Sequence, residues 1–209
     1  MIIGQNMTQG GDMDPIIPGN KEHCIFGFCI IDDFTETTEA LQTDIMGYVN
    51  KIAEITHSCV DEYHGSTNKN IGEAFLCVWK FDNPLEIELM EGKYNNLEIC
   101  IENKIIADLS VYAFLKCIAK LNKYEHILKY NEDERLLNML GDDFKVRMGF
   151  GLHQGWAIEG SIGSYFKIDA SYLSPNVNMA SRLEAATKQF GAEILISHDL
   201  KAILSDDFQ

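Results

Sequence analysis

The chain has 209 residues, of which 46% are hydrophobic and 23% charged, so it can bury one good core and has the composition of an ordinary globular protein. Its 17 Lys and Arg residues stand against 32 Asp and Glu residues, which gives a formal net charge of −15. Because a field of this sign repels other polyanions, the composition argues against binding to nucleic acid or to an anionic membrane. A nucleotide would need a local cationic pocket or metal ions.

Six cysteines are present without any C-x-x-C pairing, and most lie within apolar runs: Cys24, Cys29, Cys59, Cys77, Cys100 and Cys117. This pattern predicts reduced core residues in a cytosolic compartment rather than a zinc site. No stretch has the length of an uncharged membrane span. We therefore expect no membrane contact from this segment and a place on the cytoplasmic side, either alone or within a larger membrane-bound or assembly-bound protein.

The chain opens with residues 1–22, whose Gly, Asn, Asp and Pro content predicts a leader or linker before a domain at 23–209. A continuous apolar run at 24–31 predicts a central strand buried on both faces. A long helical stretch is expected at 35–63, and Asp33 with Glu36 has the spacing of a capping box at its start.

A hairpin follows, with a tight turn at Gly72, because glycine permits the backbone angles that such a turn needs. The stretch of about 83–134 is expected to be an insertion. The remaining pattern predicts a helix at 105–130, a half-buried strand at 144–152, a Gly-punctuated segment at 155–163, a strand at 166–173, a helix, a strand at 192–197 and a short helix at 198–204.

The helix after residue 173 has clear signals at both ends. Ser174 predicts an N-cap, Pro175 suits the first helical position, and Gly191 predicts the C-terminal end. Asn178 and Arg182 lie one turn apart on one face, where an amide and a planar cation could hold a sugar and a phosphate; an exposed polar face gives the same pattern. A narrow apolar stripe lies beside them: Val177, Ala180, Leu183 and Ala186.

Strands interleaved with helices and an antiparallel hairpin predict an α+β fold of the ferredoxin-like split βαβ type, with the helices on one face of the sheet. In such a sheet three strand ends converge. They carry Lys69 and Glu73 around the hairpin turn, and Asp169 and Ser171 before the helix with the Asn–Arg pair. Each side chain alone is well explained as a solvated residue, but together they predict a nucleotide pocket.

Four blocks stand out: F-G-F-C-I-I-D-D-F-T-E-T-T-E at 26–39, N-K-N-I-G-E-A-F at 68–75, G-L-H-Q-G-W-A-I-E-G-S-I-G at 151–163 and S-P-N-V-N-M-A-S-R-L-E-A-A-T at 174–187. In this order they resemble the class III nucleotidyl cyclase catalytic domain, the adenylyl and guanylyl cyclase family. The resemblance covers about residues 24 to 204, and its texture is most similar to cyclase domains of protists. Family domains usually continue into a further strand pair, so the C-terminal strands are expected to be missing.

The resemblance implies attack of the 3′-hydroxyl of a nucleoside triphosphate on the α-phosphorus, with release of pyrophosphate, at a site shared across a head-to-tail dimer. Two acidic residues of one subunit hold two divalent metals, Mg²⁺ or Mn²⁺. The other subunit supplies base recognition, an Asn and an Arg. Metals lower the pKa of the hydroxyl and neutralise the triphosphate, Arg stabilises the developing charge, and Asn positions the ribose.

Carried over residue by residue, the base-binding half matches the family. Lys69 matches the Lys that accepts the purine edge in adenylyl cyclases, and Ser171 matches the second base-selecting position, with Asp169 as the alternative contact. Asn178 matches the ribose-orienting Asn and Arg182 the transition-state Arg. Because Ser can hydrogen-bond adenine, ATP is favoured over GTP.

The metal half departs from the family. Phe34 and Thr35 match the turn whose backbone amides bind the triphosphate, but Ile30 stands at the first metal position and cannot ligate Mg²⁺. Glu73 replaces the second metal Asp and is longer by one methylene. Asp32 shares strand parity with Ile30, although in this turn a carboxylate would more readily repel the triphosphate than hold a metal.

Two hypotheses follow for the function. The chain is an adenylyl cyclase homology domain, inactive alone, that forms the base-binding half of a dimer with a second, metal-competent cyclase domain and makes cyclic AMP from ATP. Alternatively, it is a pseudo-cyclase that acts as a structural or regulatory module in a larger assembly, including a form that binds ATP without turning it over.

Overall fold

A computed structural model describes residues 18–82, 100–164 and 166–208. Most of the expected leader and the irregular acidic segment at 83–99 lie outside the described residues. The first strand, β1 (Asn20–Ile31), begins four residues earlier than the apolar run that predicts it.

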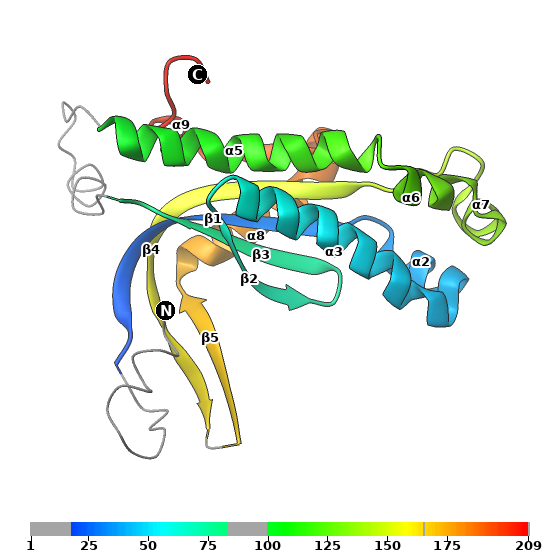
Figure 1. The fold of residues 1–209 in the computed structure, drawn as a ribbon, viewed down its shortest axis with the longest axis horizontal. Helices are drawn as coiled ribbons and strands as arrows, with labels where there is room; N and C mark the ends of the chain where they lie inside the picture. Colours follow the sequence, from blue (N-terminus) through cyan, green and yellow to red (C-terminus); the bar gives the residue numbers. More distant parts are fainter. Residues whose placement is uncertain (1–17, 83–99, 165, 209) are drawn as a thin grey trace.

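Within the described residues, a six-stranded sheet forms the centre of the domain, in the order β2-β3-β1-β4-β5 with β6 paired to β4 (Figure 1). The pairs along this path are antiparallel, and β6 runs parallel to β4. β1 pairs with β4 along its whole length and with β3 on its other side, which confirms a central strand. The other strands are β2 (Ser66–Ile71), β3 (Ala74–Lys80), β4 (Met148–Ser164), β5 (Lys167–Leu173) and β6 (Ile194–Ile196).

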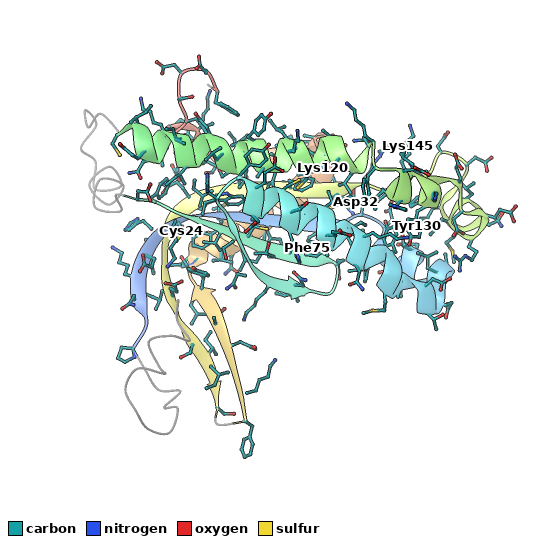
Figure 2. All side chains as sticks on the ribbon, viewed as in Figure 1. Cys24, Asp32, Phe75, Lys120, Tyr130 and Lys145 are labelled. Atoms are coloured by element: carbon teal, nitrogen blue, oxygen red, sulfur yellow. The ribbon has the colours of Figure 1, made fainter. Side chains whose placement is uncertain are left out.

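Two long helices, α3 (Ile45–Glu62) and α5 (Ile101–Leu121), cover one face of the sheet (Figure 1). Aromatic rings join them to the strands: the ring of Phe114 lies 5.6 Å from Trp79 and 4.9 Å from Phe150, between ring centroids. Side chains fill the layer between helices and sheet, including Phe75 (Figure 2). The helical part of the expected insertion, α5, therefore contributes to the main core. No helix among the described residues is long and apolar enough to cross a membrane.

The helix α8 (Pro175–Phe190) lies on the opposite face of the sheet. A smaller buried cluster lies between α8 and the strands: Cys24, Phe26, Leu76, Val78, Ala157 and Ala180. The β1 residues in this cluster alternate along the strand with the β1 residues of the main core, so they face the opposite side of the sheet. The α+β split βαβ class is confirmed, but the expectation that the helices share one face is wrong for α8. A central strand buried on both faces needs a cover on each.

Three glycines on one face of β4 allow α8 to lie directly on that strand. A methyl group at Gly151 would overlap the carbonyl oxygen of Ala180 and the amide nitrogen of Glu184. Methyl groups at Gly149 and Gly155 would collide with α8 side chains. The spacing G-x-G-x-x-x-G therefore leaves a strip of the strand surface without Cβ atoms, on which the helix can pack closely.

The helix expected at 35–63 is divided in the structure. α2 (Phe34–Leu41) ends where Gln42 adopts a left-handed φ of 52°, and a short turn η1 (Gln42–Asp44) leads into α3. The expected capping box is absent, because the backbone of Asp33 is itself left-handed and its side chain makes no capping hydrogen bond.

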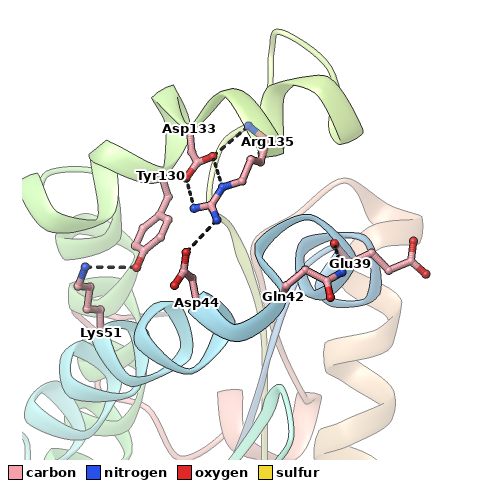
Figure 3. A network of polar contacts seen from close by, with 7 residues as sticks. All are labelled: Glu39, Gln42, Asp44, Lys51, Tyr130, Asp133 and Arg135. Atoms are coloured by element: carbon pink, nitrogen blue, oxygen red, sulfur yellow. Dashed lines mark hydrogen bonds and ion pairs between the residues drawn. The ribbon is translucent and has the colours of Figure 1, made fainter.

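A polar network ties this α2–α3 junction to the connection between α5 and β4 (Figure 3). Arg135 donates to Asp44 and to Asp133, each at 2.8 Å, and its hydrogen bonding to Asp133 lowers the pKa of that carboxyl group. Lys51 Nζ donates to the Tyr130 hydroxyl at 3.2 Å. The connection comprises α6 (Glu125–Leu128), η2 (Lys129–Glu132) and α7 (Glu134–Leu140).

The strand expected at 144–152 begins later, at Met148, and continues through the Gly-punctuated segment to Ser164. It pairs there with β5 to form an arm that extends away from the body of the domain (Figure 1). Because cross-strand pairing satisfies the backbone, the glycines of this segment do not interrupt the strand. A short helix, α9 (His198–Lys201), follows β6.

Replacing Gly151 by Ala tests the close approach of α8. The added methyl group meets helix backbone rather than a flexible side chain, so we expect the free energy of unfolding to fall by about 1–3 kcal/mol in urea titrations. Gly47 is the matched control, since it is exposed in α3 and a methyl group there would lie 4.0 Å from its nearest neighbour, the Tyr130 hydroxyl oxygen. Gly47→Ala should raise stability by about 0.5–1 kcal/mol. Similar effects of both changes would contradict the close approach.

Candidate active site

The N-terminus of α8 is fixed by a group of side-chain hydrogen bonds. The Ser174 hydroxyl accepts from the backbone N–H of Asn176 at 3.0 Å and donates to the carbonyl oxygen of Trp156 at 2.5 Å. The Asn176 side chain donates to the same carbonyl at 2.9 Å and lies 3.2 Å from Nε2 of His153. Gly191 ends the helix with a φ of 63°. The predicted cap at each end of the helix is confirmed.

Asn178 and Arg182 both lie on the exposed surface of α8. The buried residues of this helix are Ala180, Glu184 and Thr187, at successive one-turn spacings. The apolar stripe expected from the sequence is therefore rotated, because Val177, Leu183 and Ala186 are only partly buried. The Asn–Arg pair is left facing outward, where it can reach a ligand or a second molecule.

The curl of the sheet brings its two end strands, β2 and β5, into contact. Nδ2 of Asn68 donates to the carbonyl oxygen of Ala170 at 3.5 Å. Lys69 follows Asn68, and Asp169 and Ser171 flank Ala170, so the three predicted base contacts lie around one junction. This placement could not be predicted from the sequence, since Asn68 and Ala170 are 102 residues apart in the chain.

The environments of these three residues differ. The register of β2 shifts between Thr67 and Lys69, and Lys69 then pairs with Leu76, which belongs to the α8-facing cluster. Residues paired directly across strands share a face, so Lys69 lies on the α8 side. Ser171 is 8% exposed. The Asp169 carboxylate is half-exposed and lies 3.1 Å from Nζ of Lys167.

The residues of the metal half lie at one end of the sheet. Ile30 pairs with Ala74 on β3 and with Gly149 on β4, and it is half-buried. Glu73 lies in the hairpin turn next to Ala74, and its carbonyl oxygen accepts from the backbone N–H of Ile31 at 3.1 Å. Ile30 and Glu73 are therefore neighbours at this end of the sheet.

The turn after Ile31 carries the other residues expected near a triphosphate. Phe34 and Thr35 open α2; the Phe34 side chain packs against the main core, whereas Thr35 is exposed. Asp32 directly follows β1 (Figure 2), and its carboxylate lies 3.1 Å from Nζ of Lys188 at the end of α8. A cavity of about 350 Å³ opens beside this ion pair.

These side chains do not fit a divalent metal. The side chain of Ile30 offers no oxygen, and the carboxylate of Asp32 is already paired with the Lys188 ammonium. Among the residues that the structure describes, no group of three or more His, Cys, Asp or Glu side chains is arranged to hold a metal ion. Because divalent metals in such sites need several oxygen ligands, this half is poorly suited to bind them by itself.

Glu184 is the residue of this region that the sequence reading missed. It is 2% exposed and lies beneath α8, against Gly149. Burial, and then the charge of Asp32, raise the pKa of Glu184 to about 7, while the nearby Lys188 lowers it. Because carboxylates are usually exposed, the sequence of α8 alone does not predict that Glu184 is buried. The signal that could have indicated this lies in β4, whose alternating glycines leave room for a side chain of the helix.

Comparison with known proteins agrees with the fold and the order of the motifs. The sequence model of a protein family, the adenylate and guanylate cyclase catalytic domain, matches residues 18–209 of this chain. An adenylate cyclase of Anabaena cylindrica is 26% identical over 180 residues, which cover 85% of this chain and 30% of that protein. Adenylate cyclase 1 of Rhizobium meliloti is 31% identical over 180 residues, 86% of this chain and 23% of that protein. The chain thus spans less than a third of these relatives.

Solved structures agree in fold. The adenylyl cyclase CyaB of P. aeruginosa superposes with a TM-score of 0.68 at 18% identity, over 90% of this chain and 82% of that one. A bacterial light-regulated adenylyl cyclase gives a TM-score of 0.69 at 22% identity, over 92% of this chain and 48% of that one. The chain belongs to the adenylate and guanylate cyclase catalytic domain family.

Ser174→Ala tests the anchor that orients the Asn–Arg helix. It removes the N-cap and the bond to Trp156, so we expect a loss of about 1–2 kcal/mol in the free energy of unfolding, measured in urea. Ser181, half-exposed within the same helix, is the matched control. Ser181→Ala should leave stability unchanged or raise it by up to about 0.5 kcal/mol. Equal losses would show that the cap does not fix the helix.

Proposed function

We propose that this chain is an adenylyl cyclase homology domain that converts ATP to cyclic AMP and pyrophosphate as the base-binding half of a dimer with a metal-competent cyclase domain. The observation that carries the proposal is the division within the site. The Asn178–Arg182 pair is presented outward on a firmly capped helix, whereas Ile30 occupies the metal end.

The residues of this chain would each act on a different part of ATP. Lys69 and Ser171 would hold the adenine edge, with Asp169 as the alternative contact beside them. Asn178 would orient the ribose so that its 3′-hydroxyl lies in line with the α-phosphorus. Arg182 would stabilise the negative charge that builds on the phosphate as pyrophosphate leaves. The backbone amides at Phe34 and Thr35 would bind phosphate at the second, degenerate site.

The second cyclase domain would supply what this chain lacks. Its carboxylates would hold Mg²⁺ or Mn²⁺, which neutralises the triphosphate and activates the attacking hydroxyl. The partner would contact α8 or the β4–β5 arm, both of which expose large apolar side chains: Trp156, Ile158, Ile162, Leu173, Met179 and Phe190. Contiguous patches of such side chains are typical of interfaces. We place the chain on the cytoplasmic side.

The degenerate metal end favours a second candidate, a pseudo-cyclase that serves as a structural or regulatory module. With Ile30 at the first metal position, one carboxylate ligand is absent. The Lys188 ammonium neutralises the nearby Asp32 carboxylate, so this carboxylate does not need a metal ion to balance its charge. A homodimer would lack the first metal ligand at both sites. In this candidate the Asn–Arg pair would bind ATP without turnover or would contact another protein.

The test is cyclic AMP formation from Mn²⁺-ATP in a mixed dimer. The partner is a metal-competent cyclase domain whose own Asn and Arg are replaced by Ala, so that it is silent alone. The mixture with this chain should be active and this chain alone should not. Arg182→Ala should reduce the activity of the mixture by about 10²–10³-fold, whereas Gln189→Ala, at an exposed position of the same helix, should not.

A complementary variant restores the metal half within this chain. Ile30→Asp combined with Glu73→Asp should give measurable activity to the chain alone. Activity of the unmodified chain by itself would contradict the asymmetric site. If the mixture and the double variant are folded and both silent, the pseudo-cyclase candidate holds instead.

A further inference from the structure

The contact between α8 and β4 contains a buried carboxyl group that the proposed chemistry does not use. Glu184 is 2% exposed, and a methyl group at Gly149 would overlap its Oε1 atom. The same methyl group would also meet the Thr187 hydroxyl, which donates to the carbonyl oxygen of Glu184 at 2.6 Å. The carboxyl group of Glu184 therefore fills the space that the missing Cβ of Gly149 leaves.

The charged groups that act on this carboxyl are Asp32, in the turn after β1, and Lys188, on α8 itself. Asp33, Arg147 and Glu193 line the neighbouring cavity together with these two residues. The cation nearest in sequence, Lys188, is paired with Asp32 at 3.1 Å. A negative charge on Glu184, which is 2% exposed, would then be repelled by the charge of Asp32, and burial strengthens such repulsion.

We propose that Glu184 is a positioning residue for the active site: it seats α8 on β4 in its protonated form, and loss of that proton loosens the helix that carries Asn178 and Arg182. The consequence for catalysis rests on the proposed function. The proton-linked seating is a property of the folded chain and can be tested without activity.

The direction of the effect follows from the site. Burial first, and then the charge of Asp32, raise the pKa of Glu184 from 4.5 to about 7. The folded chain therefore binds this proton more tightly than the unfolded chain does. The stabilising contribution is complete below pH 4.5, declines as the pH rises, and is lost above about pH 7.

Glu184→Gln imitates the protonated form with almost the same shape. Urea unfolding between pH 5 and pH 8.5 gives the ratio of the folding equilibrium constants of variant and natural chain. We expect this ratio to rise by up to about tenfold per pH unit between pH 5 and pH 7 and then to level off. Glu193→Gln is the matched control, with the same change of charge at an exposed position near the helix end, and its ratio should stay flat. A flat ratio for Glu184→Gln would overturn the proposal.

A titration of the natural chain covers the case in which Glu184→Gln does not fold. Carbon-13 NMR of the glutamate side-chain carboxyl groups, with resonances assigned by single Glu→Asp replacements, should show one group that titrates near pH 7. A midpoint near 4.5 for Glu184 would equally overturn the proposal.

The catalytic consequence is read from the mixed dimer described above. The kcat of the natural chain should fall between pH 6.5 and pH 8.5 by several-fold more than that of Glu184→Gln, with little difference in KM for ATP. If the natural mixture is silent while the stability ratio changes as expected, the proposed function fails and the proton-linked seating stands. If the mixture is active and both pH profiles coincide, the positioning role fails and the proposed function stands.

Discussion

The close approach of α8 to β4 is the constraint on which the rest of the candidate site depends. A helix backbone can lie directly on a strand only where the strand lacks Cβ atoms, and Gly149, Gly151 and Gly155 provide this on the face that α8 covers. Once that face of the helix is fixed, Asn178 and Arg182 must lie outside. The helix is otherwise poorly apolar, and much of its buried surface is polar. Its orientation therefore depends on this fit and on the hydrogen bonds at Ser174 more than on a broad apolar stripe.

Features that local chemistry decides could be predicted from the sequence. The caps at Ser174 and Gly191, the turn at Gly72 and the central strand β1 are examples, since each follows from a few adjacent residues. Features that depend on contacts between distant segments could not. The break at Gln42, the extension of β4 into an arm, and the position of α8 on the second face all require partners far along the chain. The signal for the last was present, because a strand with two apolar faces needs two covers.

The same distinction applies to the candidate site. The types of the side chains at Lys69, Ser171, Asn178 and Arg182 could be predicted from the motifs. The placement of Lys69 near Ser171 depends on the curl of the sheet, which joins β2 to β5 through Asn68 and Ala170. The pairing of charges at the metal end could not be predicted from the sequence either. From the sequence, Asp32 is expected to repel a triphosphate more readily than to replace the lost metal ligand, and in the structure Lys188 pairs with it. The net charge of −15 makes such local pairing important, because any anionic nucleotide must be attracted against the field of the whole chain.

The two ends of α8 are held by different physical interactions. Its N-terminal half, which carries Asn178, is fixed by hydrogen bonds at Ser174 and Asn176. Its C-terminal half rests on Glu184 and ends at Lys188, so its seating depends on how two carboxyl groups share one ammonium. Ile30, which pairs with Gly149, adds no negative charge to this end. A buried Glu184 beside Asp32 is easier to accommodate without a further carboxylate there, because burying an unpaired charge is costly.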